Sequence, residues 1–205
     1  MSKFIHLHVH SEYSLLDGLA KIDALIAKAK QDGMEAIALT DHGVMYGAIE
    51  FYKKCLEQGI KPIIGVEFYL APRKMTDRTP KIDTSPYHLT LLAKNKIGYK
   101  NLMKLSTLAH LEGYYYKPRI DRRTLKKYTR GLICLSGCLK GDIPRLILAG
   151  NIKGAKKRIA FYKKIFGWDN FYLEIQPHQN LPEQKKANEK MVELSRKTKT
   201  QLVIT

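Results

Sequence analysis

Apolar residues follow two alternating patterns along the chain, short continuous runs and stripes with helical spacing. The runs predict strands at residues 4–10, 35–40, 61–70, 87–93, 132–136, 171–176 and 201–204. The stripes predict helices at residues 22–32, 48–58, 97–109, 142–149, 152–166 and around 187–194. A short basic helix through Lys127 is predicted to be capped by Asp121, and the proline-containing segment 71–86 is predicted to be a loop.

The regular alternation of strand and helix predicts an α/β fold with a parallel sheet wrapped by helices. Seven predicted strands without a glycine-rich dinucleotide fingerprint favour a closed or nearly closed barrel over a Rossmann sheet. No pronounced linker divides residues 1–205, so we expect one domain. Because the chain stops on a buried-type strand, we expect it to be an N-terminal fragment of a longer protein.

Composition adds a preference for polyanionic partners. Lysine and arginine total 36 against 19 acidic residues, a net charge of +17, which favours nucleic acid. A general lysine bias of the source organism would give the same charge. The three cysteines form no paired framework, and neither a signal peptide nor an apolar run long enough for a membrane is present. We therefore expect a cytoplasmic protein with no membrane partner.

The first predicted strand carries His6, His8 and His10 at alternate positions, which places all three imidazoles on one face. A buried strand face normally holds Val, Ile, Leu or Phe, and adjacent buried histidines would need partners for their polar nitrogens. A lone histidine is usually a satisfied core or surface residue. Three in alternation, followed by Asp17, favour metal binding.

Further metal-binding residue types follow the ends of other predicted strands, where function collects in α/β barrels. They are Asp41 and His42 after 35–40, Glu67 late in 61–70, and Cys138 after 132–136. His88 fits less well because it opens its strand. Individually, Asp41 could cap a helix, Glu67 could be a paired buried carboxylate, and Cys138 could be a small apolar residue. Together they predict a multinuclear metal site that activates water and holds phosphate oxygens.

The longest motifs are HLHVHSEYSLLDG at 6–18, ALTDHGVMYGAIEFYKK at 38–54, GIKPIIGVEFY at 59–69, HLTLLAKNKIGYKNL at 88–102, GYYYKPRID at 113–121 and LICLSGCLKGDIP at 132–144. With them the chain resembles the polymerase-and-histidinol-phosphatase (PHP) family over nearly its whole length. The long middle segments are similar to the members that form the N-terminal domain of bacterial DNA polymerase III alpha subunits.

This resemblance implies a distorted seven-stranded TIM-like (βα)7 barrel of the PHP type, truncated here at its C-terminus. It also implies up to three divalent metal ions, zinc or manganese, at the barrel rim. The implied ligands are His8, His10, Asp17, His42, Glu67, His88 and Cys138. His6 and Asp41 would not bind the metal themselves but would orient the residues that do. No side chain is expected to act as general base, because a metal-bound hydroxide would attack the phosphodiester.

One departure from the family pattern concerns the end of the chain. The family's last ligands are an Asp and a His after the seventh strand, and the chain stops before them at Thr205. We expect a metal that shares those ligands to be bound weakly or to be missing in the fragment.

In polymerase-associated members of the family, the intact site implies 3′–5′ exonuclease proofreading during DNA replication. The implied partners are DNA, the remainder of the polymerase alpha subunit and the replisome. Two alternatives stay open at this point. The domain could be a non-catalytic scaffold that stabilises the polymerase, or a phosphoesterase similar to histidinol phosphatase.

Aromatic and basic residues gather in one further stretch of the chain. Aromatic side chains can stack on bases, and neighbouring basic side chains can bind phosphates. This stretch therefore predicts contacts with single-stranded DNA or a primer 3′ end. The residues are Tyr114, Tyr115, Lys117, Arg119, Arg122 and Arg123. Equally, the tyrosines could pack against the rest of a polymerase. The lysines of 152–166 lie mostly off the apolar stripe, which predicts an ordinary solvated face.

Overall fold

A computed structural model describes residues 4–178 and 180–205. Its strands are β1 (Ala36–Leu39), β2 (Lys61–Leu70), β3 (Tyr87–Ala93), β4 (Arg119–Ile120), β5 (Leu132–Leu135), β6 (Phe171–Ile175) and β7 (Gln201–Ile204). Its helices are α1 (Ile22–Gln31), α2 (Ala48–Glu57), α3 (Lys96–Leu111), α4 (Arg122–Lys127), α5 (Asp142–Leu148), α6 (Ile152–Phe166), α7 (Pro182–Thr198) and the 3-10 turn η1 (Trp168–Asn170).

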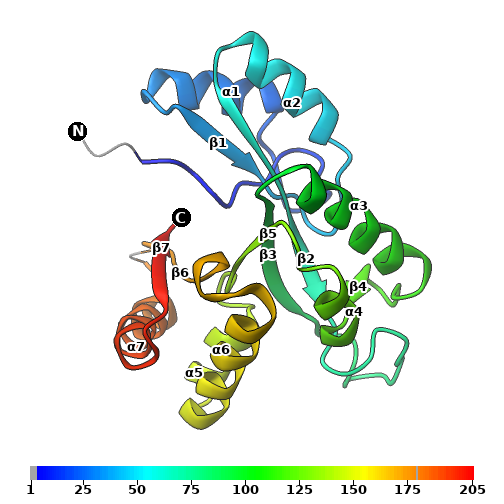
Figure 1. Cartoon of the computed structure of the whole chain (residues 1–205), viewed down its shortest axis with the longest axis vertical. Helices are drawn as coiled ribbons and strands as arrows, with labels where there is room; N and C mark the ends of the chain where they lie inside the picture. Colours follow the sequence, from blue (N-terminus) through cyan, green and yellow to red (C-terminus); the bar gives the residue numbers. More distant parts are fainter. Residues whose placement is uncertain (1–3, 179) are drawn as a thin grey trace.

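The strands form one curled, mixed sheet in the order β1-β2-β3-β5-β6-β7, with β4 beside β2. β3 runs antiparallel to both of its neighbours, whereas the β1–β2, β5–β6 and β6–β7 pairs are parallel. Helices α1 and α2 lie against one end of this half-barrel, and α5, α6 and α7 lie against the other (Figure 1). The α/β class is confirmed, but the prediction of an all-parallel sheet is wrong at β3.

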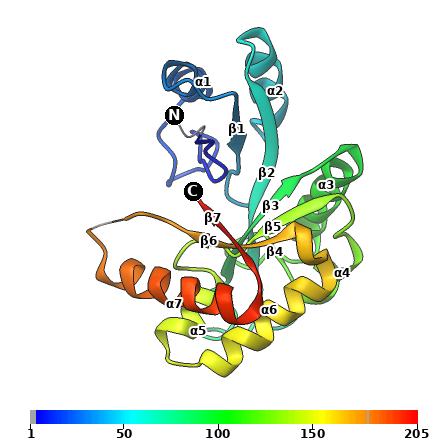
Figure 2. The same cartoon turned by 60° about the vertical axis from the view of Figure 1, so that its left-hand side comes forward.

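The predicted first strand is also wrong in detail, because residues 4–10 form no regular strand. The segment still lies beside β1, where the Ala38 N–H donates to the His6 carbonyl at 2.9 Å and the Thr40 N–H donates to the Val9 carbonyl at 2.8 Å. Figure 2 shows β7 ending close to this segment, and Leu7 and Val203 pack on one apolar cluster. The N-terminal segment therefore lies between β1 and β7 without completing a barrel.

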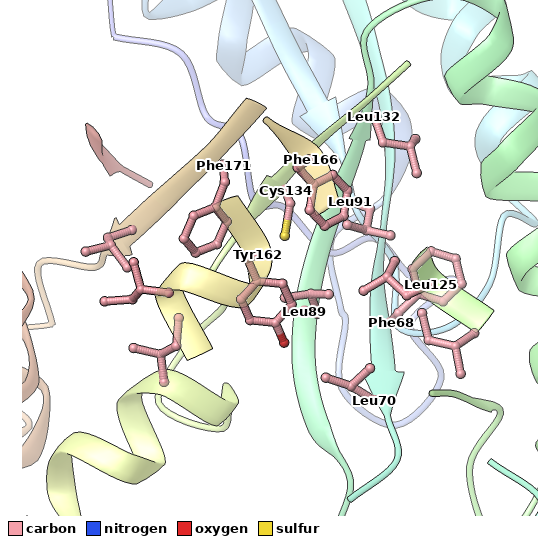
Figure 3. Packing of buried hydrophobic residues seen from close by; sticks show 14 of the residues in the cluster. Phe68, Leu70, Leu89, Leu91, Leu125, Leu132, Cys134, Tyr162, Phe166 and Phe171 are labelled. Atoms are coloured by element: carbon pink, nitrogen blue, oxygen red, sulfur yellow. The ribbon is translucent and has the colours of Figure 1, made fainter. Parts of the chain in front are cut away.

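Alternate residues of the strands point outward into the layer between the sheet and the helices. Figure 3 shows Leu89 of β3 packed near Tyr162 of α6, with Phe68 of β2 and Leu125 of α4 on the other side of the strand. All four side chains are fully buried, and each large apolar side chain contributes about 1.5–3 kcal/mol when it is removed from water. The predicted helices, including the one capped by Asp121, are all present in this layer or against β1.

The inward-pointing residues change character along the sheet. At one end they are apolar and include Ile63, Leu92, Ile133, Tyr172 and Val203. At the other end they are polar and include Glu67, His88, Ser136 and Glu174, all of them buried. His88 reaches this polar end because β3 runs in the opposite direction, so that His88 pairs with Tyr69 near the end of β2. The fold thus brings to one rim polar side chains from β2, β3 and β6 and from the residue that follows β5.

Candidate metal centre

The loop after the N-terminal segment is tied to the rim by Asp41, which is 2% exposed. Its carboxylate accepts hydrogen bonds from the Ser11 N–H at 2.7 Å, the Ser11 hydroxyl at 2.8 Å and the Ser14 hydroxyl at 2.7 Å. Charge-assisted bonds of this kind are about twice as strong as neutral ones. Asp41 therefore fixes the segment that carries His8, His10 and Asp17 against the end of β1.

Glu67 of β2 lies at the centre of the rim and is 1% exposed. Its Oε1 is 3.2 Å from His8 Nε2 and 3.1 Å from His88 Nδ1. Its Oε2 is 3.3 Å from His10 Nε2 and 2.8 Å from His42 Nδ1. One buried carboxylate therefore faces four imidazoles from three separate segments of the chain.

These side chains fall into two groups that share Glu67. His8, His10 and Glu67 form one triad, and His42, Glu67 and His88 form the other. The Nε2 atoms of His8 and His10 are 3.2 Å apart. Two ligands of a tetrahedral zinc ion, each about 2.1 Å from the metal, would be about 3.4 Å apart. The spacing within the first triad therefore suits two imidazoles and a carboxylate on one ion, with Glu67 able to bridge to a second.

Hydrogen bonds on the far side of two imidazoles turn the opposite nitrogens toward Glu67. His8 Nδ1 is 2.6 Å from Glu174 Oε1. His10 Nδ1 is 2.9 Å from Ser14 Oγ, which already donates its proton to Asp41 and therefore accepts from the ring. With Nδ1 of each ring committed to these acceptors, a bound cation that displaced the Nε2 proton would meet the Nε2 lone pairs of both imidazoles. Metal-binding histidines are normally oriented in this way.

Asp17 and Cys138 lie at the edges of the second triad. Asp17 Oδ2 is 3.1 Å from His42 Nε2, and its side chain is 54% exposed. Leu16, beside it, has a left-handed backbone at φ +68°, which holds the loop in an unusual turn. Cys138 Sγ is 3.5 Å from His88 Nδ1. All seven predicted ligands therefore lie in one connected cluster.

Burial and charge set the ionisation of the first triad. Burial of His8 disfavours its charged form, but the charges of Glu174 and Glu67 outweigh this and hold its pKa well above the ordinary value. Burial of Glu67 acts to raise its pKa, but the charge of His8 and hydrogen bonds from the imidazoles hold that pKa well below its usual range. Glu67 is therefore an anion in the core, where a cation stabilises it.

Burial favours the neutral form of two groups at the second triad, His88 within it and Cys138 at its edge. Desolvation lowers the pKa of His88, only partly offset by Glu67. Burial, together with the charge of Glu67, raises the pKa of the Cys138 thiol to about 12. A thiolate at Cys138 at neutral pH therefore requires a bound cation.

The residues present fit divalent metal ions. Glu67 Oε1, His42 Nδ1 and Glu174 Oε2 are buried atoms that no aligned hydrogen bond satisfies. Such atoms are costly unless they find a partner. Imidazole nitrogens and carboxylate oxygens in this number are donors for zinc, manganese or iron. A metal ion would satisfy the first two of these atoms at once.

Comparison with known proteins agrees with this donor set. A family model described as the PHP domain matches residues 6–178, which is most of the chain. The chain belongs to the PHP domain family. This PHP domain is 55% identical over 196 residues to DNA polymerase III subunit alpha of Borreliella burgdorferi, which covers 95% of the chain and 17% of that protein. It is 48% identical over 207 residues to the same subunit of Thermus aquaticus, which covers 99% of the chain and 17% of that protein.

A solved structure described as a metal-dependent phosphoesterase, from Bifidobacterium adolescentis, shares the fold. It superposes with a TM-score of 0.54 at 12% identity, over 98% of the PHP domain and 85% of that chain. In the described part of the chain, no helix is both long and apolar enough to cross a membrane.

The two residues expected behind the ligands differ in their positions. Asp41 acts through Ser14, whose Oγ contacts His10 Nδ1 and accepts from the His42 N–H at 3.1 Å. His6 is exposed, and its ring packs edge-on against Phe4 at 4.8 Å, outside the cluster. The structure therefore gives a supporting contact to Asp41 and none to His6.

Two of the arginines expected to contact DNA have partners inside the protein. Arg119 is fully buried and donates to the carbonyls of Gly113, Met75, Asp77 and Asp83. Its charge fixes the loop 71–86 and is not available to a ligand at the surface.

Arg122 is also engaged inside the molecule, where its Nη2 donates to Asp142 at 2.9 Å.

The remaining expected DNA contacts lie nearer the surface. Tyr114, Lys117 and Arg123 are exposed, while Tyr115 is half-buried. Lys117 Nζ lies 5.4 Å from the centre of the Tyr69 ring, and that ring stacks on His42 at 5.5 Å. Of the expected DNA contacts, Lys117 is thus linked through Tyr69 to the cluster of candidate metal ligands.

Sequence reasoning missed Glu174, which lies near the end of β6 and is 2% exposed. Besides contacting His8, its Oε1 accepts from the Thr205 hydroxyl at 2.7 Å. The available signal was an acid within the apolar run 171–176, the same signal that singled out Glu67.

Proposed function

We propose that this PHP domain hydrolyses phosphodiesters with divalent metal ions, zinc or manganese, held at the rim. The proposed ligands are His8, His10, Asp17, His42, Glu67, His88 and Cys138, with up to three ions in an intact domain. The observation that carries the proposal is the single buried Glu67 carboxylate facing four imidazoles at 2.8–3.3 Å. A carboxylate shared by two ligand groups is the arrangement expected of a multinuclear site.

Bound divalent ions would lower the pKa of a coordinated water and neutralise phosphate oxygens and the leaving oxygen. The residues of the chain would position the metal ligands and orient the substrate. Glu174 and Ser14 fix the tautomers of His8 and His10, so that their Nε2 atoms face Glu67. Lys117, above Tyr69, supplies a positive charge beside the cluster, where a substrate phosphate would approach. No further side chain is assigned as a general base.

The proposed substrate is the 3′ end of a DNA strand, cleaved by 3′–5′ exonuclease action. We place the activity in a domain spanning residues 1–205 of a bacterial DNA polymerase III alpha subunit, working in the cytoplasm with the rest of the replisome. The high identity to two proteins of that name supports this assignment. Since the chain spans about 17% of their length, DNA synthesis would belong to the remainder of such a protein.

The test measures bound metal and exonuclease activity in the chain and in the full-length polymerase. His10→Ala and Glu67→Ala should lose metal and activity together, since each removes a member of the first triad. His6→Ala is the matched control, because it removes an exposed imidazole outside the cluster.

Strands labelled at either end report the polarity of cleavage, and a phosphomonoester substrate reports phosphatase activity. If the polymerase holds no metal and both variants equal wild type, the domain is a scaffold without catalysis. If the domain released phosphate from the monoester but did not cleave the labelled strands, its activity would instead be that of a small-molecule phosphatase.

A further inference from the structure

A second candidate site lies on the opposite side of the sheet layer from the metal centre. A surface pocket of about 390 Å³ lies between α6, η1 and the end of α7. Its lining residues are Lys156, Ile159, Ala160, Lys163, Lys164, Trp168 and Thr198. Figure 2 shows α6 and α7 packed together below the sheet, away from the N-terminal segment. η1 precedes β6, whereas Glu174 lies near the end of that strand, so the two sites lie at opposite ends of β6.

Trp168 forms a fixed aromatic platform at this pocket. It is the only tryptophan in the sequence, and it is 65% exposed. Lys163 Nζ lies 3.5 Å from the centre of its ring, a close cation–π contact. Lys163 is itself 8% exposed and donates to the carbonyls of Thr198 at 2.6 Å and Lys199 at 3.2 Å. A buried, anchored cation thus holds an indole whose remaining surface faces solvent.

The charges around the platform are strongly one-sided. α6 contains six lysines and arginines and no acidic residue. Lys156 and Lys164 are exposed at the pocket, whereas Arg158 is engaged by Asp142 at 3.0 Å. Asp169, beside Trp168 in η1, is the neighbouring acid on that turn. Three pocket lysines against one acid favour an anionic ligand.

We propose that this pocket binds single-stranded nucleic acid, with one base stacked on Trp168 and adjacent phosphates on Lys156 and Lys164. An exposed aromatic ring beside a row of cations is the usual platform for a single strand, because every base has a stacking face. A pocket of this volume is large enough for a nucleoside. An acidic protein segment would use the lysines but not the open indole face. The proposal does not rest on hydrolysis at the metal centre.

The test titrates the 205-residue chain with a labelled oligothymidylate in the presence of EDTA. Fluorescence anisotropy of the label reports binding, and quenching of the single tryptophan reports contact at Trp168. Both signals should give the same midpoint. Trp168→Ala should weaken binding about tenfold, as expected for the loss of one stacked base. Because Trp168 is largely exposed, this variant should keep its fold, and circular dichroism checks that it does.

A pair of double variants separates a built site from general positive charge. Lys156→Gln with Lys164→Gln should weaken binding about tenfold and reduce the slope of log K against log salt concentration by about 1.4. Lys53→Gln with Lys100→Gln removes the same charge from exposed positions on α2 and α3 and should change affinity less than about twofold. Because EDTA keeps divalent metal from the rim throughout the titration, failure of the proposed hydrolysis and failure of this site are distinguishable.

Three results would overturn the proposal. The first is oligothymidylate binding without quenching of Trp168. The second is equal weakening by the two double variants. The third is quenching by polyaspartate as strong as that by the oligonucleotide, which would assign the pocket to an acidic protein partner.

Discussion

Two buried carboxylates are each surrounded by polar side chains, and the residue types around them differ. Glu67 and Asp142 are both 1% exposed. Glu67 faces four imidazoles at the rim. Asp142 accepts hydrogen bonds from Arg122 at 2.9 Å and the Tyr162 hydroxyl at 2.8 Å, and it pairs with Arg158 at 3.0 Å. One cluster is built from groups that can lose a proton, the other from permanent cations and a phenol.

This difference separates a candidate site from a structural ion cluster. A guanidinium offers only N–H donors, so it neutralises Asp142 but cannot bind a metal ion. Burial and the charge of Asp142 hold the pKa of Tyr162 well above its ordinary value, so that it stays a donor. Asp142 Oδ1 lacks a hydrogen bond, as Glu67 Oε1 does. An unsatisfied buried oxygen therefore does not identify a metal site by itself. A metal site also needs neighbouring side chains, such as imidazoles, that can offer lone pairs.

The largest expected effect concerns the Asp142 cluster. Asp142→Ala should lower the free energy of unfolding by about 3 kcal/mol, because it leaves Arg122 partly buried without its counter-charge. Denaturant titration measures this change. Metal affinity, measured by calorimetry, should stay within about twofold of wild type. A parallel loss of metal binding would show that the two clusters are coupled and would break the comparison.

Glu67→Gln should instead lower metal affinity more than about a hundredfold, since even groups behind metal ligands contribute 10–100-fold. The amide keeps the shape of the side chain but loses the charge that both triads share. Glu57→Gln, at an exposed position on α2, is the control for loss of one negative charge. Unchanged affinity in Glu67→Gln would remove Glu67 from the site.

Metal addition should stabilise the folded chain by about 2.7 kcal/mol at a free metal concentration one hundred times the dissociation constant. The gain should appear in wild type and in Asp142→Ala but not in Glu67→Gln. Thermal unfolding with zinc, with manganese and with EDTA measures it. Equal gains in all three proteins would place the ion elsewhere in the molecule.

The smallest expected effect tests the support behind His10. Ser14→Ala should lower metal affinity about tenfold, because it removes the acceptor that fixes the His10 tautomer. Ser11→Ala also removes a hydrogen bond to Asp41 but touches no imidazole, so it serves as the control. Calorimetry on both variants measures the difference. Similar losses would mean that Asp41 acts on the whole loop and not through His10.

Six of the seven strands and the α-helices followed from the sequence, but the short strand β4 and the direction of β3 did not. An apolar run such as 87–93 reads the same in either direction, and the long loop 71–86 allows both. Reversal of β3 removes the difficulty with His88, because the start of a reversed strand lies beside the ends of its neighbours. Residues 4–10 do not form a regular strand, although polar and apolar residues alternate clearly along them. The reason is that they make only scattered backbone hydrogen bonds to β1 and the residue after it.

Candidate residues were found where an unusual side chain interrupted an apolar pattern. Glu67 and Glu174 carry this same signal, yet only Glu67 also stood in a family motif. Arg119 and Arg122 read as part of a basic surface because a run of charges does not show which members are buried. Arg119 is buried because four backbone carbonyls converge on it, and these come from loop segments far apart in the sequence.

The sharing of Glu67 by two triads would make the filling of the proposed metal centre stepwise. A first ion at either triad would neutralise the charge of Glu67 and would then repel a second ion at the other triad. The two binding steps should therefore have unequal affinities, with negative cooperativity between them. A chain purified at limiting metal would hold one ion tightly, and its full complement would appear only at higher metal concentration. Activity would then follow the weaker step.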